Sequence, residues 1–176
     1  NIIANDFTLF NDQHEKIETI SLNTNKGISD RDSYKKFKFN NPDDYFYKIV
    51  DDYKDIMSDK MKLTIFSPGG LLENVTSVMG YENLCINLYD DENLVANIFD
   101  DIGLRLFRYY ENCVKNELVG AIVVNDDWGF NTQTMISPEY IKRYVFPWHK
   151  KIVNLAHENN KPAILHSCGN LSDIID

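Results

Sequence analysis

The sequence predicts an α/β fold built on a parallel sheet. Three short segments are almost entirely apolar, Leu63–Phe66, Val119–Val124 and Pro162–His166, and helical patterns separate them. Strands of this kind are typical of a parallel sheet that is covered on both faces, and their alternation with helices is found in doubly wound sheets and in (β/α)8 barrels. Three strands cannot close a barrel, which usually needs about 250 residues. We therefore expect either an open three-stranded sheet or part of a barrel.

The first 40 residues follow a different pattern, which predicts a β-hairpin or a small subsheet. Residues 14–20 alternate polar and apolar side chains, as a half-buried strand does. Residues 23–27 carry turn-forming Asn and Gly, and Tyr34–Phe39 is the expected returning strand. We divide the chain into a hairpin segment, residues 1–40, and a partial barrel with three parallel strands, residues 41–176.

Capping residues and apolar spacing predict the helices that precede the second strand. Asn41–Asp44 combines a capping side chain, a proline in the first turn and two acids, which is typical of a helix start. Apolar residues follow it at helical spacing as far as Met57. Residues 71–79 and 82–89 predict two short helices that are divided near Gly80.

The pattern around the second strand predicts two longer helices. Residues 91–115 have the apolar spacing of a long amphipathic helix. After the strand, Ser137 is expected to cap a helix with Pro138 in its first position. Pro147 lies within that helix and is expected to kink it, because proline removes a helical hydrogen bond.

The charge balance disfavours a nucleic-acid partner. The 176 residues include 18 Lys and Arg against 27 Asp and Glu, for a net charge of -9, whereas binding to a phosphate backbone needs basic patches. The sequence also contains no apolar run near the roughly 20 residues that a membrane span requires. We therefore expect neither a nucleic-acid partner nor a membrane partner.

Cysteine usage indicates a reducing compartment. Cys85, Cys113 and Cys168 are far apart and odd in number, which favours free thiols over a disulfide framework. The expected localisation is cytoplasmic.

Each of the three predicted strands ends in polar or conformationally special residues. The three segments are Ser67-Pro68-Gly69-Gly70, Asp126-Asp127-Trp128-Gly129 and His166-Ser167-Cys168-Gly169. Functional sites of parallel α/β folds are built at the carboxyl ends of the strands. Three such segments in succession therefore predict a single site at one edge of the sheet.

His166 and Cys168 form a candidate metal-binding pair. Residues i and i+2 of an extended chain point to the same side, so the imidazole and the thiol are expected to face one point at the end of a strand. Nitrogen and sulfur ligands together suit zinc. The alternative is a buried histidine beside a cysteine that serves as a small apolar residue.

A catalytic zinc ion usually takes three protein ligands, and the other His and Cys residues are poor candidates for the third. Cys85 and Cys113 lie on helical patterns. His149 and His157 are expected on a helix surface, in contact with solvent.

Asp126 and Asp127 are the candidate acids of the site. Because adjacent residues of a strand point to opposite sides, only one of the two carboxylates should face the site. That carboxylate is either a metal ligand or an acid/base group, and we favour Asp127 because it lies further into the loop. The alternative for both is a turn or helix-capping role.

Four segments of the chain resemble the uroporphyrinogen decarboxylase superfamily. Ile136–Tyr140 (ISPEY), Phe146–Trp148 (FPW) and Leu165–Asn170 (LHSCGN) stand in the order and spacing of that superfamily. Asp126–Gly129 (DDWG) fits the branch that resembles the zinc-dependent methylcobalamin:coenzyme M methyltransferases. The superfamily fold is a single (β/α)8 barrel longer than this chain, so the resemblance implies a partial barrel.

The two branches differ in the residues that matter for chemistry. The methyltransferase branch has a His-x-Cys pair where this chain has His166 and Cys168, and it supplies another cysteine from a later strand that has no counterpart here. True uroporphyrinogen decarboxylases lack that pair and carry a catalytic tyrosine near the position of Asn74. The resemblance therefore favours the methyltransferase branch, with a zinc site that is incomplete within this chain.

The activity that the resemblance implies is transfer of a methyl group between a corrinoid and a thiol, with zinc and a corrinoid as cofactors. The expected partners are a corrinoid protein or free corrinoid and a small thiol substrate. Asp127 would complete the metal shell or orient a ligand, and the Ser67–Gly70 loop and Trp128 would line the mouth for a large flat cofactor. The alternatives are a cofactor-free tetrapyrrole decarboxylase and a non-catalytic corrinoid- or tetrapyrrole-binding module.

Overall fold

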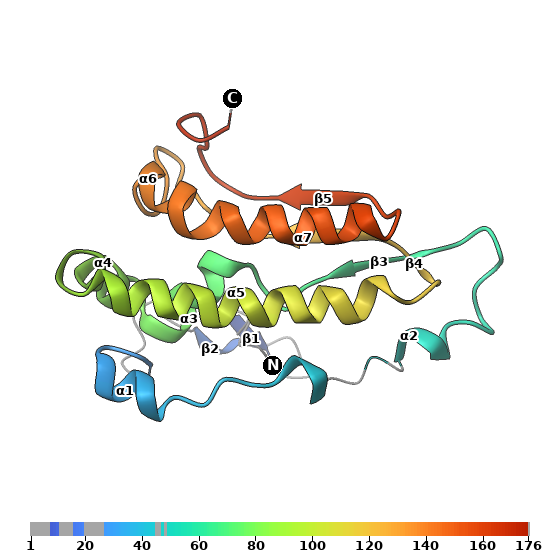
Figure 1. The fold of residues 1–176 in the computed structure, drawn as a ribbon, viewed down its shortest axis with the longest axis horizontal. Coiled ribbons are helices and arrows are strands. Elements are labelled where there is room, and N and C mark those ends of the chain that lie inside the picture. The colour runs from blue at the N-terminus through green and yellow to red at the C-terminus, as the bar shows by residue number, and fades with distance from the viewer. Residues whose placement is uncertain (1–7, 11–15, 20–26, 45–46, 48, 176) are drawn as a thin grey trace.

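A computed structural model describes residues 8–10, 16–19, 27–44, 47 and 49–175. Its centre is a parallel sheet in the order β3–β4–β5, made of β3 (Leu63–Phe66), β4 (Val119–Asn125) and β5 (Ala163–His166). Helices α5 (Glu92–Val114) and α7 (Phe146–Glu158) lie side by side and pack against the sheet (Figure 1). The α/β class and the three parallel strands of a partial barrel are thereby confirmed.

The register of the sheet brings the carboxyl ends of the strands to one edge. Phe66 pairs with Val123, and Asn125 pairs with His166. The hydroxyl of Tyr110, on α5, donates to the carbonyl of Val123 at 2.7 Å and accepts the N–H of Ser67 at 3.2 Å. One buried side chain therefore ties the ends of β3 and β4 together.

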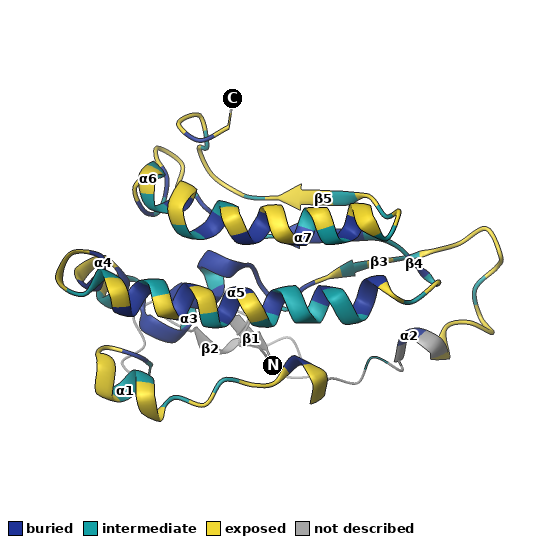
Figure 2. Ribbon diagram, in the orientation of Figure 1, coloured by how far each residue is buried: buried dark blue, intermediate teal, exposed yellow. Residues whose placement is uncertain are grey.

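Burial is uneven across the three strands. Ile122, Val123 and Val124 of the central strand β4 are buried, as expected for a strand covered on both faces. In contrast, Ile164 and Leu165 of β5 are 52% and 48% exposed (Figure 2). Phe66 of β3 is 57% exposed as well. The expectation of cover on both faces was thus wrong for β3 and β5 among the described residues.

Helix α5 provides the largest apolar face of the core. Its buried residues, which recur at helical spacing, include Val95, Ile98, Phe99 and Ile102. Each such side chain contributes about 1.5–3 kcal/mol when it leaves water. Gly103 lets α7 approach closely, because a Cβ there would lie 2.4 Å from the Trp148 ring. No helix in the described ranges has both the length and the apolar character that crossing a bilayer requires.

Two short helices precede α5, as predicted. Helices α3 (Leu71–Met79) and α4 (Tyr81–Asp90) are separated by Gly80, whose φ of +78° is a conformation that favours glycine. Asp91 then caps α5, since its side chain accepts the N–H of Leu94 at 3.2 Å.

The helical segment after Ser137 contains a π turn rather than a simple kink. It consists of α6 (Pro138–Tyr140), the π turn η2 (Ile141–Val145) and α7. Pro147 has no N–H to donate and would collide with a carbonyl of the preceding α-helical turn. The π turn, in which Phe146 donates to the carbonyl of Ile141, widens the helix next to that proline.

The hairpin near the N-terminus differs from the prediction in its partner strand. Strand β2 (Lys16–Thr19) lies within the predicted segment 14–20, but it pairs antiparallel with the preceding β1 (Thr8–Phe10). The predicted turn falls largely on residues 20–26, which lie outside the described residues. The division of the chain at residue 40 stays a prediction.

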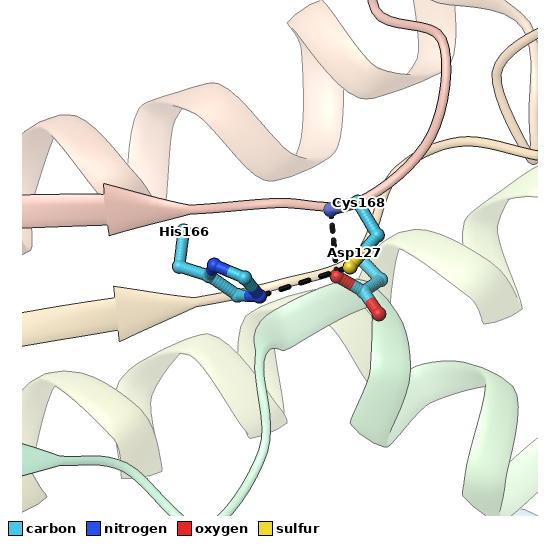
Figure 3. A group of neighbouring side chains, drawn as sticks. All are labelled: Asp127, His166 and Cys168. Atoms are coloured by element: carbon cyan, nitrogen blue, oxygen red, sulfur yellow. Dashed lines mark hydrogen bonds between the residues drawn. The ribbon is translucent and has the colours of Figure 1, made fainter.

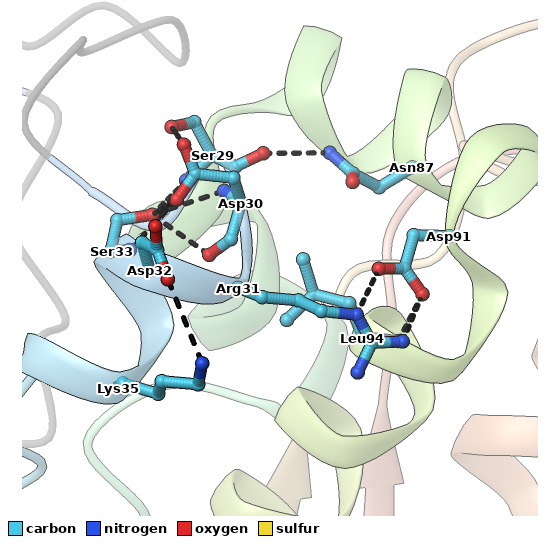
Figure 4. A network of polar contacts seen from close by, with 9 residues as sticks. All are labelled: Ser29, Asp30, Arg31, Asp32, Ser33, Lys35, Asn87, Asp91 and Leu94. Atoms are coloured by element: carbon cyan, nitrogen blue, oxygen red, sulfur yellow. Dashed lines mark hydrogen bonds and ion pairs between the residues drawn. The ribbon is translucent and has the colours of Figure 1, made fainter.

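The predicted returning strand at Tyr34–Phe39 was wrong, because helix α1 (Arg31–Lys36) occupies much of it. The side chain of Asp30 accepts the N–H of Ser33, and the Ser33 hydroxyl accepts the N–H of Asp30. This reciprocal capping starts a helix despite the alternating pattern. Arg31 then holds α1 against the start of α5 through two hydrogen bonds to Asp91, at 2.6 and 2.7 Å (Figure 4).

The helix predicted from Asn41 to Met57 includes residues 45, 46 and 48, which lie outside the described residues, and its described part holds two short helical pieces. A 3₁₀ turn, η1 (Pro42–Asp44), is followed by the single turn α2 (Ile49–Asp52). Tyr53 and Ile56, which continue the apolar pattern, are 45% and 78% exposed. The spacing was helical, but among the described residues these side chains stay largely exposed, and helical spacing alone does not sustain a helix.

Candidate metal centre

Three potential metal ligands meet at the carboxyl ends of β4 and β5. One oxygen of Asp127, one ring nitrogen of His166 and the sulfur of Cys168 all lie within 4.8 Å of one another (Figure 3). Asp127 follows β4, His166 ends β5, and Cys168 is two residues further on. His166 and Cys168 are exposed and Asp127 is half-buried. The structure therefore brings together the three residues that the sequence favoured for metal binding.

The distance between the nitrogen and sulfur ligands matches a zinc ion closely, whereas the group as a whole is wider than a zinc site. Tetrahedral zinc with its usual bond lengths holds a nitrogen and a sulfur ligand about 3.6 Å apart. The Nε2 of His166 lies 3.7 Å from the Sγ of Cys168, and the group as a whole spans up to 4.8 Å. Nitrogen, sulfur and carboxylate oxygen are also the ligand types that zinc accepts, so the donor set fits the metal.

The electrostatics of the group also favour a cation. The hydrogen bond to Asp127 and the negative charge of that carboxylate raise the pKa of the Cys168 thiol. A thiolate and a carboxylate side by side repel one another unless a positive charge lies between them. A divalent cation would offset this repulsion and deprotonate the thiol.

Two glycines let the loops after β4 and β5 approach closely enough to assemble the group. Gly169 has a φ of +91°, and a Cβ there would lie 2.2 Å from the carbonyl of Gly129. The N–H of Asn170 donates to the carbonyl of Phe130 at 2.7 Å. The Cys168 N–H likewise donates to Oδ1 of Asp127 at 2.8 Å. Gly129 and Gly169 stood in the sequence as parts of two strand ends, and the structure shows that they touch.

Asp126 points away from this group and into the core. Its side chain is 0% exposed, and its Oδ1 accepts the N–H of Glu73 at 3.2 Å. Glu73 is in the first turn of α3, whose N-cap Gly70 has no side chain to cap the helix. Asp126 therefore takes the helix-capping alternative in this structure, and the catalytic role stays a prediction.

His149 was expected to be solvated on a helix surface, and that expectation was wrong. It is 8% exposed on α7, and its Nε2 lies 2.9 Å from Oδ2 of Asp126. His149 is buried together with Ile152 and Ala156, three and seven residues further on, so helical spacing is the signal that could have placed it on the buried face. His157, in the last turn of α7, is exposed as predicted.

Glu73 is a residue of this region that the sequence reasoning missed. Its Oε2 accepts the N–H of Gly70 at 2.6 Å. Burial raises the pKa of Glu73, and the nearby charges of Asp126 and Asp127 raise it further. Glu73 stands three residues after the N-cap Gly70, which is the position of the Glu in a capping box. This spacing is the signal that could have identified Glu73 from the sequence.

The loop from Ser67 to Gly70 closes on itself and on β4. The Ser67 hydroxyl donates to the carbonyl of Gly69 at 2.7 Å, and Gly69 has a φ of +85°. A Cβ on Gly70 would lie 2.2 Å from Oδ1 of Asp126. Pro68 is half-buried, and its carbonyl accepts the side-chain N–H of Asn74 at 3.3 Å. These contacts make the loop a tight strand-to-helix turn beside the metal group.

Trp128 does not line an open mouth in this structure. Its side chain is 2% exposed and packs against Phe146 and His149, with ring centroids 5.3 and 5.0 Å away. The backbone of Trp128 still helps to join the strand ends, since its N–H donates to the hydroxyl of Ser167 at 3.1 Å.

The other two cysteines are remote from the three-residue group. Cys85 is exposed on α4, and Cys113 is buried on α5. Burial raises the pKa of the Cys113 thiol to about 11, which keeps it protonated near neutral pH.

A solved structure shares this fold. It is a methyltransferase from Methanosarcina mazei, with a TM-score of 0.56 and 14% sequence identity. The match covers 71% of this chain and 35% of the other, so the chain spans about a third of that protein. At this identity the likeness concerns the fold alone.

Sequence comparison places the chain in a family. No curated protein sequence matches it. The sequence model of the uroporphyrinogen decarboxylase (URO-D) family matches residues 20–176, nearly the whole chain. This match includes the three strands of the parallel sheet, and it includes Asp127, His166 and Cys168. The chain therefore belongs to the uroporphyrinogen decarboxylase family.

Proposed function

We propose that the protein is a zinc-dependent methyltransferase that moves a methyl group between a corrinoid and a small thiol. The observation that carries this proposal is the meeting of Asp127, His166 and Cys168 ligand atoms within 4.8 Å at the ends of two neighbouring strands. The proposed reaction class is also the one named for the solved methyltransferase that shares this fold.

His166, Cys168 and Asp127 are the residues that would hold the metal. Bound zinc would supply a Lewis acid that keeps a substrate thiol deprotonated at neutral pH. Asp127 would complete the set that His166 and Cys168 begin, and tetrahedral zinc then offers one further position for the substrate. His166 and Cys168 are exposed, so a large flat corrinoid, free or carried by a protein, can reach the same edge of the sheet.

Charge and backbone geometry assign different roles to Cys168 and Asp127. Cys168 is the ligand that must lose a proton, and Asp127 raises its pKa while the metal is absent. Metal binding is therefore expected to release a proton and to strengthen as the pH rises. The backbone hydrogen bond between Cys168 and Asp127 holds both ligands in place.

A cofactor-free decarboxylase of a tetrapyrrole is the second candidate, because the matching family model is that of uroporphyrinogen decarboxylase. Such an enzyme releases carbon dioxide from uroporphyrinogen without a metal. Carbon dioxide release by chelator-treated protein would favour this candidate, and our proposal predicts none.

Metal content and methyl transfer test the proposal together. We expect zinc to copurify with the protein and to be lost in His166→Ala and Cys168→Ser. The matched controls His157→Ala and Cys85→Ser change exposed residues remote from the group and should retain zinc. Demethylation of methylcobalamin by a thiol should follow zinc content. Zinc that is absent, or that survives both site variants, would refute the metal site.

A further inference from the structure

A buried pair of side chains, Asp126 and His149, lies directly behind the candidate metal centre. The two are 0% and 8% exposed, and Nε2 of His149 lies 2.9 Å from Oδ2 of Asp126. We propose that this pair is a positioning device that orients the end of β4 so that Asp127 points at His166 and Cys168. The inference rests on the metal site proposed above and assigns to it two residues that do not touch the metal.

The Asp126 carboxylate is held from two sides. Its Oδ2 faces His149 on α7, and its Oδ1 accepts the N–H of Glu73 on α3. Gly70 provides the space, since a Cβ there would lie 2.2 Å from Oδ1 and 2.3 Å from Cβ of Asp126. Contacts from α3 and α7, together with the space beside Gly70, therefore fix the orientation of the Asp126 side chain.

The backbone of Asp126 carries that constraint to β5. Its N–H donates to the carbonyl of His166 at 2.9 Å. Neighbouring side chains of an extended chain point to opposite sides, so an inward Asp126 directs Asp127 outward. The outward carboxylate then accepts the Cys168 N–H at 2.8 Å. A shift of the Asp126 backbone would therefore move Asp127 relative to both other ligands.

His149 is the member of the pair that comes from outside the strand ends. Its ring meets Trp128 edge to face, with centroids 5.0 Å apart, and Trp128 packs on Phe146. The packing fixes the ring, and the hydrogen bond fixes the carboxylate. Groups that orient metal ligands in this way typically change metal affinity about 10–100-fold when removed.

Two substitutions at one position separate positioning from packing. His149→Gln keeps an N–H donor within reach of Asp126, whereas His149→Met fills similar space without one. We expect zinc affinity, measured by competition with a chromogenic chelator, to fall at least about 10-fold in His149→Met and to stay near the wild-type value in His149→Gln. The absorption spectrum of the cobalt-substituted protein should change in His149→Met alone.

Asp127 provides the control for mechanism. If the pair acts through Asp127, His149→Met should have little further effect on zinc affinity in an Asp127→Ala background. If His149→Met does not fold, Asp126→Asn combined with His149→Met removes the unpaired buried charge and should show the same loss of affinity. Denaturant unfolding of the metal-free proteins identifies which variants are folded.

The outcomes distinguish this inference from the proposed function. Folded His149→Met that binds zinc as tightly as wild type, or that loses equal affinity with and without Asp127, would overturn the positioning role and leave the metal site intact. Wild-type protein that binds no zinc would overturn both.

Discussion

The backbone N–H of Cys168 donates a hydrogen bond of 2.8 Å to Oδ1 of Asp127. This bond joins the loop after β5 to the end of β4, and it brings a carboxylate next to a thiol. In the absence of a metal the contact raises the pKa of Cys168. If a cation binds, the same hydrogen bond would keep the Asp127 carboxylate and the Cys168 sulfur close enough to bind it together.

Replacing Asp127 by Asn should make the Cys168 thiol more acidic in metal-free protein. The amide oxygen still accepts the Cys168 N–H, but the negative charge that raises the thiol pKa is gone. Alkylation of Cys168 at pH 7–8 should therefore accelerate about severalfold, because the thiolate is the reacting form. Mass spectrometry of each cysteine peptide measures this. Cys85, exposed on α4, is the internal control, and an unchanged rate at Cys168 would contradict the electrostatic account.

Gly169→Ala should destabilise the protein more than Gly129→Ala. Gly169 has a φ of +91°, and a Cβ there would lie 2.2 Å from the Gly129 backbone. A Cβ at Gly129 would meet its nearest atoms at 3.0 Å, without a positive φ. We expect a loss of about 2–4 kcal/mol in the free energy of unfolding for Gly169→Ala and about 1 kcal/mol for Gly129→Ala. Denaturant titration of both variants gives the comparison, and equal losses would count against the close approach of the two loops.

Gly103→Ala should destabilise the protein although alanine is the better helix former. Alanine normally gains about 0.5–1 kcal/mol over glycine within a helix, but here its Cβ would lie 2.4 Å from the Trp148 ring. Overpacking costs about 1–3 kcal/mol, so we expect a net loss of about 1–2 kcal/mol. Asn97→Ala, at an exposed position of the same helix, is the matched control and should gain slightly. Stabilisation by Gly103→Ala would show that α5 and α7 are further apart than described.

Asp91 should contribute stability that disappears in acid. The hydrogen bond from Arg31 lowers the pKa of Asp91 below its ordinary value of 3.8, and the Leu94 N–H lowers it further (Figure 4). Because the folded-state pKa is the lower one, this stability is present above about pH 4 and is lost as the pH falls through the folded-state pKa.

Comparison with Asp91→Asn isolates this charge, since asparagine can still cap α5. Wild type should exceed the variant in stability at neutral pH, and the two should converge in acid. In an Arg31→Ala background the difference should shrink. A difference that is independent of both pH and Arg31 would contradict the ion-pair explanation.

The strands of the central sheet were predicted well, because each is a short apolar run that can be recognised in the sequence. Leu63–Phe66, Val119–Asn125 and Ala163–His166 are apolar runs with polar ends, and their short length favours strands over helices. Tyr34–Phe39 misled for the opposite reason. Its alternation resembled a strand, but the reciprocal capping of Asp30 and Ser33 selected a helix.

The candidate site could be predicted only in its exposed half. His166 ends β5 and Cys168 follows it by two residues, so the two-residue period of an extended chain was enough to place them together. Alternation predicted that only one of Asp126 and Asp127 faces the site, and Asp127 was favoured because it lies further into the loop. Capping-box spacing and helical spacing mark Glu73 and His149 one by one. Their contacts with Asp126 could not be predicted, because they come from separate helices whose packing the local pattern does not specify.

X-ray absorption at the zinc edge tests the central claim most directly. Zinc-loaded wild-type protein should show a sulfur scatterer at about 2.3 Å together with nitrogen or oxygen scatterers at about 2.0–2.2 Å. Cys168→Ser, which should not retain zinc on purification, should show no sulfur scatterer when it is loaded with added zinc, and His157→Ala should leave the spectrum unchanged. A spectrum with nitrogen and oxygen scatterers alone, or one that Cys168→Ser does not alter, would contradict a metal centre at Asp127, His166 and Cys168.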